Sequence, residues 1–197
     1  MLLISLILAA ALPGLPKTAA TPEDFVPKTW EIEARVDGAL TAPDAQDVVL
    51  VLLEDEHGEN DRRRALVVLK AEKEGYSLLA TNVGLVACFG CQGPRGDGEP
   101  AVTIENRVLS VNQVGGGAES TSTTHRFRLE KGGLKLIGRD TGCERCPDRY
   151  HFLRSENLIG LEVVEELVVK EDDKPGRTKK KLPAAPLQAL EDVARAP

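Results

Sequence analysis

Apolar residues recur along this chain mostly in short runs, separated by glycine, asparagine and charged residues. Short runs rich in β-branched side chains are typical of strands and not of helices. We therefore predict ten strands, at 30–36, 48–53, 65–69, 76–80, 102–105, 108–114, 120–129, 134–138, 151–154 and 161–169. The predicted fold class is mainly β, with consecutive strands paired as an antiparallel meander.

The polar pattern separates two kinds of strand. The runs 48–53 and 66–69 are apolar at every position, which predicts central strands that are covered on both faces. Segment 120–129 instead alternates, with His125 and Phe127 on one face and arginines on the other, which predicts one solvent-exposed face. A β-sandwich or a strongly curved sheet satisfies both patterns.

Turn chemistry supports the meander. Segment 72–75 ends in Gly75, Asn106-Arg107 separates two predicted strands, and Lys131 is followed by two glycines. Such residues favour the tight connections of β-hairpins.

The chain opens with an uncharged apolar run at residues 2–12, followed by Pro13-Gly14 and the small residues Thr18-Ala19-Ala20. This order is typical of an export signal with a cleavage site, so we predict a signal peptide at 1–20 and a periplasmic or extracellular protein. One departure is that no basic residue follows Met1. The alternative interpretation is an apolar N-terminal strand or helix of the fold.

The rest of the chain predicts one β-rich domain at 21–169 and a charged flexible tail at 170–197. Within that tail, Leu187, Leu190 and Val193 lie at helical spacing and predict a short C-terminal helix. No second apolar segment reaches membrane-spanning length, so we expect a soluble mature protein without membrane insertion.

The net charge and the composition limit the classes of partner that the chain is expected to bind. The formal charge is −6, the pI is about 5.2 and aromatic residues make up 4% of the chain. Nucleic-acid binding needs a clustered positive field, so this balance argues against a nucleic-acid partner. The same charge and composition are compatible with a protein partner.

The candidate chemistry lies in two Cys-x-x-Cys pairs, Cys88/Cys91 and Cys143/Cys146, which contain all the cysteines of the chain. Four thiolates brought together would hold one structural zinc. An oxidising compartment instead favours disulfides, and four cysteines allow three pairings that the sequence does not distinguish. The third alternative, a redox-active dithiol, needs a helix N-terminus that the pattern does not predict.

A link between the two pairs would hold the Gly- and Pro-rich excursion at 92–100 against the turn at 141–150. These two loops are therefore the expected place of a binding surface, because loops held on a rigid sheet often carry function. This expectation requires the four sulfurs to form one cluster.

Several stretches taken together are similar to a known group of proteins. They are Cys88-x-x-Cys91-x-Gly93, the pattern at 102–111, Gly115-Gly116-Gly117, Phe127-Arg128, Leu136-Ile137-Gly138 and the opening Asp24-Phe25-Val26-Pro27-Lys28-x-Trp30. In these the chain resembles an uncharacterised family of secreted bacterial β-rich proteins. The resemblance implies export and a single domain, and it supplies no activity.

Some members of that family have an integrin-like, aspartate-rich calcium loop between their first two strands. In the corresponding stretch 38–47, Ala39, Thr41 and Pro43 stand where oxygen ligands would be, and Asp47 keeps its place. Calcium takes six to eight oxygen ligands, so the resemblance implies a degenerate loop that does not bind calcium.

Catalytic sequence motifs such as Gly-x-Ser-x-Gly and His-Glu-x-x-His are absent from the sequence. His57 is interpreted as a surface side chain, and His125 and His151 as strand residues. We therefore predict a non-enzymatic binding or structural module whose cysteine pairs hold loops. The alternative is a thiol-redox or metal-dependent enzyme centred on the cysteines.

Overall fold

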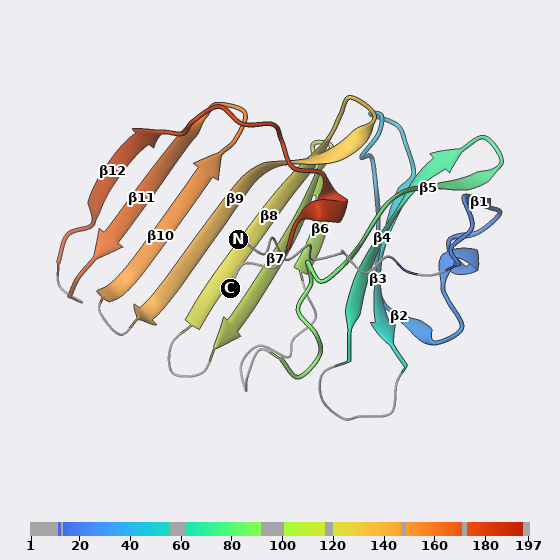
Figure 1. The fold of residues 1–197 in the computed structure, drawn as a ribbon, viewed down its shortest axis with the longest axis horizontal. Coiled ribbons are helices and arrows are strands. Elements are labelled where there is room, and N and C mark those ends of the chain that lie inside the picture. The colour runs from blue at the N-terminus through green and yellow to red at the C-terminus, as the bar shows by residue number, and fades with distance from the viewer. Residues whose placement is uncertain are drawn as a thin grey trace, which may run out of the picture.

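The computed structural model describes residues 12, 14–55, 62–91, 101–116, 120–146, 149–170 and 173–194, and it contains two antiparallel sheets (Figure 1). The predicted leader before residue 12, His57 and the loop 92–100 lie outside the described residues. The first sheet has the order β1-β5-β4-β3-β2, with β1 (Thr18–Ala19), β2 (Trp30–Gly38), β3 (Asp47–Glu54), β4 (Arg64–Glu72) and β5 (Gly75–Val83). The second has the order β12-β11-β10-β9-β8-β7-β6, with β6 (Ala101–Glu105), β7 (Val108–Gly116), β8 (Ser120–Glu130), β9 (Gly133–Cys146), β10 (Arg149–Asn157), β11 (Glu162–Val168) and β12 (Gly176–Lys181).

The prediction of a mainly β meander is confirmed. Every predicted strand is present, and β2 to β5 and β6 to β12 each pair in chain order. The predicted turns adopt the conformation that tight hairpins need: φ is positive at Asn106 and Arg107 (51° and 61°) and at Lys131 and Gly132 (50° and 83°). Two successive residues with positive φ match the right-handed twist of the flanking strands.

The two sheets face each other over one apolar core, which makes a β-sandwich. The first sheet contributes Val49, Val51, Leu66 and Val68, and the second contributes Leu109, Val111, Phe127, Leu134 and Leu136. His125 and Phe127 of β8 point into this core, while Arg126 and Arg128 of the same strand are partly exposed. The alternation predicted for 120–129 is thus confirmed.

A second apolar cluster covers the other face of the first sheet. Its strand residues are Val48, Leu50, Leu52, Ala65, Val67 and Leu69. The N-terminal segment lies over them and contributes Leu12, Phe25 and Trp30, with the 3₁₀ helix Pro22–Phe25 on the right of Figure 1. Every residue of β3 is buried as a result, which confirms the prediction that this run is covered on both faces.

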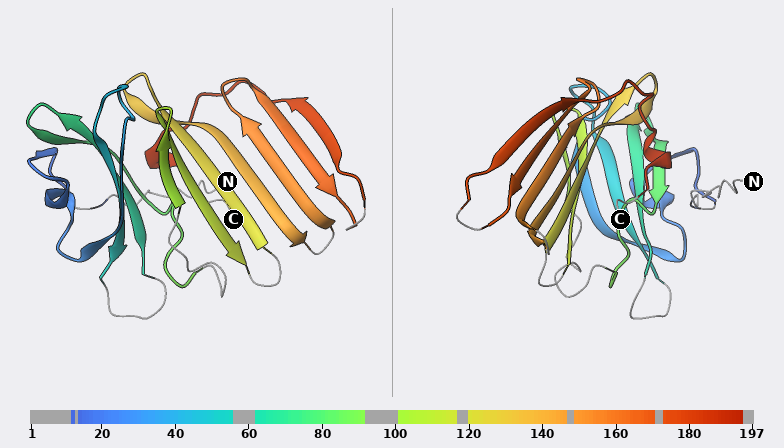
Figure 2. Two further views of the ribbon diagram at one scale, coloured as in Figure 1. Left: turned by 180° about the vertical axis from the view of Figure 1, so that it is seen from behind. Right: turned by 60° about the vertical axis from the view of Figure 1, so that its left-hand side comes forward.

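The second sheet is wider than the first. Strands β10, β11 and β12 make extensive contacts only with neighbouring strands of their own sheet. They extend away from the first sheet, as Figures 1 and 2 show, and we call these three strands the wing. At the edge of the second sheet opposite the wing, β6 lies close to β2. A Cβ atom added to Gly38 of β2 would be only 3.0 Å from the Cβ of Ile104 of β6.

The prediction of a flexible tail from residue 170 is corrected by β12. Its lysines face carboxylates of β11: Lys179 and Lys181 both contact Glu162, at 2.7 and 2.8 Å, and Lys180 contacts Glu165 at 3.0 Å. The two hydrogen-bonding lysines lower the pKa of Glu162 to about 2. A run of like charges becomes a strand here because its counter-charges lie on the neighbouring strand, and lysines on an edge strand also discourage further pairing.

The C-terminal segment returns to the core. Leu190 and Val193 are buried between the sheets, and Leu190–Asp192 forms a short 3₁₀ helix at the position where helical spacing predicted a helix. The buried amide of Asn82 donates to the backbone oxygens of Leu190 and Val193, at 2.6 and 2.9 Å. The domain therefore extends well past residue 169.

None of the helices in the described part of the chain has the length and the apolar character needed to span a membrane.

Candidate functional site

Each cysteine pair is bonded within itself. Cys88 and Cys91 form a disulfide with Cα atoms 5.3 Å apart, in the segment that follows β5. Cys143 and Cys146 form a disulfide with Cα atoms 5.9 Å apart, at the end of β9. The staple between the two pairs that the sequence analysis proposed is therefore wrong, and each bond constrains a short local loop.

The structural zinc that the sequence analysis left open at Cys88, Cys91, Cys143 and Cys146, as an alternative to disulfides, is contradicted. All four sulfurs are used in disulfides, and the described residues contain no group of three or more His, Cys, Asp or Glu side chains that could hold a metal ion. The sequence could not distinguish these outcomes, because the same spacing serves a zinc knuckle and a local disulfide.

In the part of the chain that the structure describes, neither disulfide lies at the N-terminus of a helix. The helices of the described chain are two short 3₁₀ helices, Pro22–Phe25 and Leu190–Asp192, and neither contains a cysteine. A helix N-terminus is what lowers the thiol pKa in thioredoxin-like sites.

The Cys88–Cys91 loop is held by Arg64 at the start of β4. The Arg64 side chain is 2% exposed, donates to the backbone oxygen of Ala87 at 3.2 Å and lies over the ring of Phe89, 5.5 Å from its centroid. Its guanidinium also forms two hydrogen bonds to Glu33, and its Nε lies 2.7 Å from Oε2. The sequence gives no sign of this site, since Arg62, Arg63 and Arg64 form a short charged run and such runs are usually solvated.

The Cys143–Cys146 disulfide lies beside an exposed apolar cluster. Cys143 is opposite Phe152 of β10, and Phe152 is opposite Leu167 of β11, so their side chains share one face. Tyr150 lies two residues before Phe152 and Val169 lies two residues after Leu167, so both are on the same face as that pair. The amide of Tyr150 donates a hydrogen bond of 3.2 Å to the backbone oxygen of Val169. We call Tyr150, Phe152, Leu167 and Val169 the wing patch.

This patch supplies three of the large apolar side chains that are exposed in the described part of the chain, Tyr150, Leu167 and Val169. Seven large apolar side chains are exposed in the described part of the chain, and five of them lie between residues 150 and 169. Of these five, Tyr150, Leu167 and Val169 belong to the wing patch, whereas Leu153 lies on the opposite face of β10 and Ile159 lies in the connection between β10 and β11. The other two are Ile32 and Val114. Contiguous exposed apolar surface in a soluble domain marks an interaction site more often than scattered residues do.

Next to the wing patch, a row of alternating charges crosses four strands on the same face. Arg139 contacts Glu156 at 2.7 Å, Glu156 contacts Arg154 at 2.8 Å, Arg154 contacts Glu165 at 2.5 Å, and Glu165 contacts Lys180 at 3.0 Å. Burial raises the pKa of Glu156, but hydrogen bonds from Arg154 and Arg139 outweigh burial and hold this pKa below its ordinary value. The row contains three cations and two carboxylates, so it leaves one positive charge beside the wing patch.

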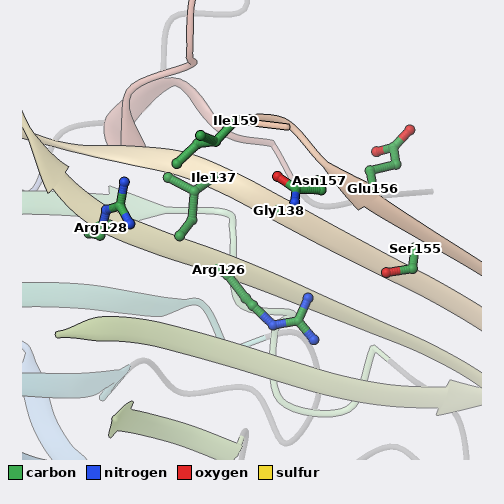
Figure 3. Close-up of a pocket in the computed structure, with 8 residues that line it drawn as sticks. All are labelled: Arg126, Arg128, Ile137, Gly138, Ser155, Glu156, Asn157 and Ile159. Carbon is green, nitrogen blue, oxygen red and sulfur yellow. The ribbon is translucent and has the colours of Figure 1, made fainter. Parts of the chain in front are cut away.

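The opposite face of the second sheet carries a hollow of about 490 Å³ (Figure 3). It is lined by Arg126, Arg128, Ile137, Gly138, Ser155, Glu156, Asn157 and Ile159. A β-bulge in β9 leaves Ile137 without a register partner, between Leu136 opposite Phe127 and Gly138 opposite Arg126. Glycine is needed at 138, because a Cβ there would lie 3.1 Å from the backbone oxygen of Glu156. Bulges often change side-chain direction near binding sites.

The arginines of this hollow already have anionic partners. Arg126 pairs with Asp140, whose other oxygen accepts a hydrogen bond from Ser155 at 2.7 Å, and Arg128 pairs with Glu130 at 2.5 Å. In Figure 3 the Glu156 carboxylate points away from Arg126. An anionic ligand would have to compete with these carboxylates, so the wing patch is the stronger candidate for a binding surface.

The buried side chain of His125 has an unusual pKa that can be tested separately from the binding surface. His125 is fully buried, and neither ring nitrogen has a hydrogen-bond partner among the described residues. Burial, with a smaller contribution from the charge of Arg139, lowers its pKa to about 4 from an ordinary value of 6.5. The folded protein therefore keeps His125 neutral, whereas the unfolded chain binds a proton below pH 6.5.

We expect His125 to make the protein acid-sensitive. The stability that depends on neutral His125 is fully present above pH 6.5 and is lost as the pH falls towards 4. The free energy of unfolding should drop by about 3 kcal/mol over this range. Urea unfolding of wild type and His125→Leu at pH 7 and pH 4 measures this, and the variant should lose about 3 kcal/mol less than wild type. His151→Leu is the matched control, because His151 is a partly exposed histidine of β10. Equal pH dependence of the unfolding free energy in wild type and His125→Leu would contradict the role of His125 in acid sensitivity.

With this geometry in place, the chain was compared with known proteins. No protein-family model, curated protein or solved structure matches it. Function therefore has to be argued from the wing patch, the disulfides and the charges around them.

Proposed function

We propose that this protein is an exported, non-enzymatic binding module, and that the wing patch is its docking surface for a protein partner. The observation that carries the proposal is the set of exposed apolar side chains on one face of the wing, Tyr150, Leu167 and Val169, next to the partly buried Phe152. The two disulfides support an oxidising compartment outside the cytoplasm, and so does the leader pattern of the sequence.

The architecture supports a surface kept open for a partner. The wing patch lies on the face that packs against the first sheet further along, at β6 to β9, and the wing extends beyond that sheet. An apolar face that stays exposed costs stability and solubility, so its retention favours a role in binding. The adjacent Cys143–Cys146 disulfide restricts the end of β9 and limits the ordering needed on association.

Charge favours a partner segment that carries acidic as well as apolar side chains. The charge row leaves one excess cation beside the patch, and Lys180 at the end of that row is 64% exposed. Such cations steer an acidic partner and disfavour a basic one, although the chain as a whole has a net charge of −6.

Two synthetic peptides test this proposal directly. One alternates phenylalanine with glutamate, and the other replaces every glutamate with lysine. Isothermal titration of the wild-type protein should give a Kd for the glutamate peptide about tenfold or more below that for the lysine peptide, and the difference should shrink as salt is added. Leu167→Ser together with Val169→Ser should weaken binding of the glutamate peptide about tenfold or more.

Ile32→Ser is the matched control, because Ile32 and Leu167 are both 37% exposed and Ile32 lies on the first sheet. This control should bind the glutamate peptide as wild type does. Equal losses in the two variants, or no measurable binding of either peptide, would count against the wing patch as the docking surface.

A further inference from the structure

The segment that the sequence analysis assigned to the end of a leader is part of the first sheet. Thr18 and Ala19 form β1 and pair with Ser77 and Tyr76 of β5. The backbone oxygen of Lys17 accepts a hydrogen bond of 2.9 Å from the Leu78 amide. These bonds satisfy the edge of β5, which would otherwise present unpaired backbone groups.

The same segment completes the second apolar cluster. Leu12 is 7% exposed, and Leu15 and Ala19 pack against the cluster formed by β3, β4 and the 3₁₀ helix. Cutting the chain after Ala20 would therefore remove β1 and uncover part of the apolar face of the first sheet. Burial of a leucine side chain contributes favourably to folding, so the fold depends on this segment.

Gly75 shows that the hairpin between β4 and β5 accommodates β1. Its φ is +93°, and a Cβ at this position would lie 2.2 Å from the backbone oxygen of Ala19. Glycine thus permits both the turn itself and the close approach of the N-terminal segment. This approach is possible only if residue 19 stays in the folded chain.

We infer that residues 12–20 remain in the mature protein and that the leader is removed at the Ala11–Leu12 bond, not after Ala20. The inference rests on the export in the proposed function. The sequence Ala9-Ala10-Ala11 supplies the small residues that leader peptidases require before the cut. Hydrolysis of this peptide bond consumes one water and leaves a carboxylate on Ala11 and an α-ammonium group on Leu12.

The N-terminus of the exported product tests the inference. The full chain, with its own leader and a C-terminal affinity tag, is expressed in a bacterial host, and the periplasmic and cytoplasmic fractions are purified separately. Intact mass and Edman sequencing should show a periplasmic product that begins at Leu12.

The other outcomes are distinguishable. A periplasmic product that begins at Thr21, or one that keeps the whole leader, overturns the inference and leaves export standing. A product found only in the cytoplasm overturns the export in the proposed function and the inference that rests on it.

Thermal unfolding provides a second measurement. Chains that begin at Leu12 and at Thr21 are exported behind an unrelated leader, and the shorter chain should unfold about 10 °C lower. Gly75→Ala is then introduced into both. It should lower the Tm of the longer chain more, because only there does the new Cβ meet Ala19, and equal shifts would overturn the inference.

Discussion

Replacing Asp47 with alanine is expected to lower the free energy of unfolding by about 4 to 5 kcal/mol. The Asp47 carboxylate is fully buried and accepts hydrogen bonds from the backbone amides of Leu40, Thr41 and Ala71, at 3.0, 2.6 and 2.9 Å. It also accepts a hydrogen bond from the Thr41 hydroxyl at 2.9 Å. Alanine would leave these buried and partly buried donors without their acceptor.

Chemical denaturation of the two proteins measures this loss, provided that the variant folds. Asp44→Ala is the matched control, because Asp44 is an exposed aspartate in the same connection between β2 and β3. The control should change stability by less than about 0.5 kcal/mol. Asp47→Asn should fall between the two, since the amide keeps one acceptor oxygen and directs its NH₂ group at a donor. A loss below about 1 kcal/mol for Asp47→Ala would contradict this role.

The importance of Asp47 also explains the form of the 38–47 connection. The resemblance to secreted proteins singled it out as the remaining carboxylate of a degenerate calcium loop. In the structure its two oxygens accept hydrogen bonds from Leu40 and Thr41 at the start of the connection and from Ala71 of β4. A buried carboxylate that accepts several backbone hydrogen bonds can hold a loop without a cation.

Much of the fold could be predicted from the sequence because its signals are local. The apolar runs specified the strands, and Asn106, Arg107 and Gly132 specified tight turns, since each signal depends on residues a few positions apart. The alternation of His125 and Phe127 with arginines even indicated which face of β8 is buried.

The remaining features depend on residues far apart in the chain. Segment 176–181 is a strand because Glu162 and Glu165 face its lysines, and the sequence does not show that these segments pair. The wing patch exists because the second sheet has two strands more than the first, seven against five. Pairing within each Cys-x-x-Cys, in place of a zinc cluster, is likewise decided by which segments the fold brings together.

The arginines at 62–64 illustrate the same limit. Charge runs are usually solvated, yet Arg64 opens a strand whose apolar residues are covered on both faces, so it is buried with them. Its burial is made tolerable by Glu33, which lies at the register shift between Ile32 and Ala34 of β2 and accepts hydrogen bonds from its guanidinium. A single sequence gives no sign of this pair.

Replacing Arg64 with alanine is therefore expected to cost about 3 to 5 kcal/mol in the free energy of unfolding. The change leaves Glu33, whose side chain is 11% exposed, without its cation, and it removes the hydrogen bond to Ala87 and the contact with Phe89. Arg64→Lys should lose less but should not restore wild-type stability, because an ammonium group cannot form the paired bonds to Glu33. Denaturant unfolding measures both losses.

Arg35→Ala is the matched control. The Arg35 side chain is 38% exposed and pairs with Glu23 and Asp37 at the surface, so its loss should cost no more than about 1 kcal/mol. Similar losses for Arg35→Ala and Arg64→Ala would contradict the importance assigned to the buried pair.

Reduction kinetics separate local docking from global stability. In Arg64→Ala, limited dithiothreitol treatment followed by alkylation and mass spectrometry should show faster reduction of Cys88–Cys91, while Cys143–Cys146 changes less. A variant that only unfolds more often would expose both disulfides to the same extent. Selective reduction of the first disulfide would thus identify Arg64 as the residue that holds the Cys88–Cys91 loop on the sheet, and equal acceleration of both would reduce its role to general stability.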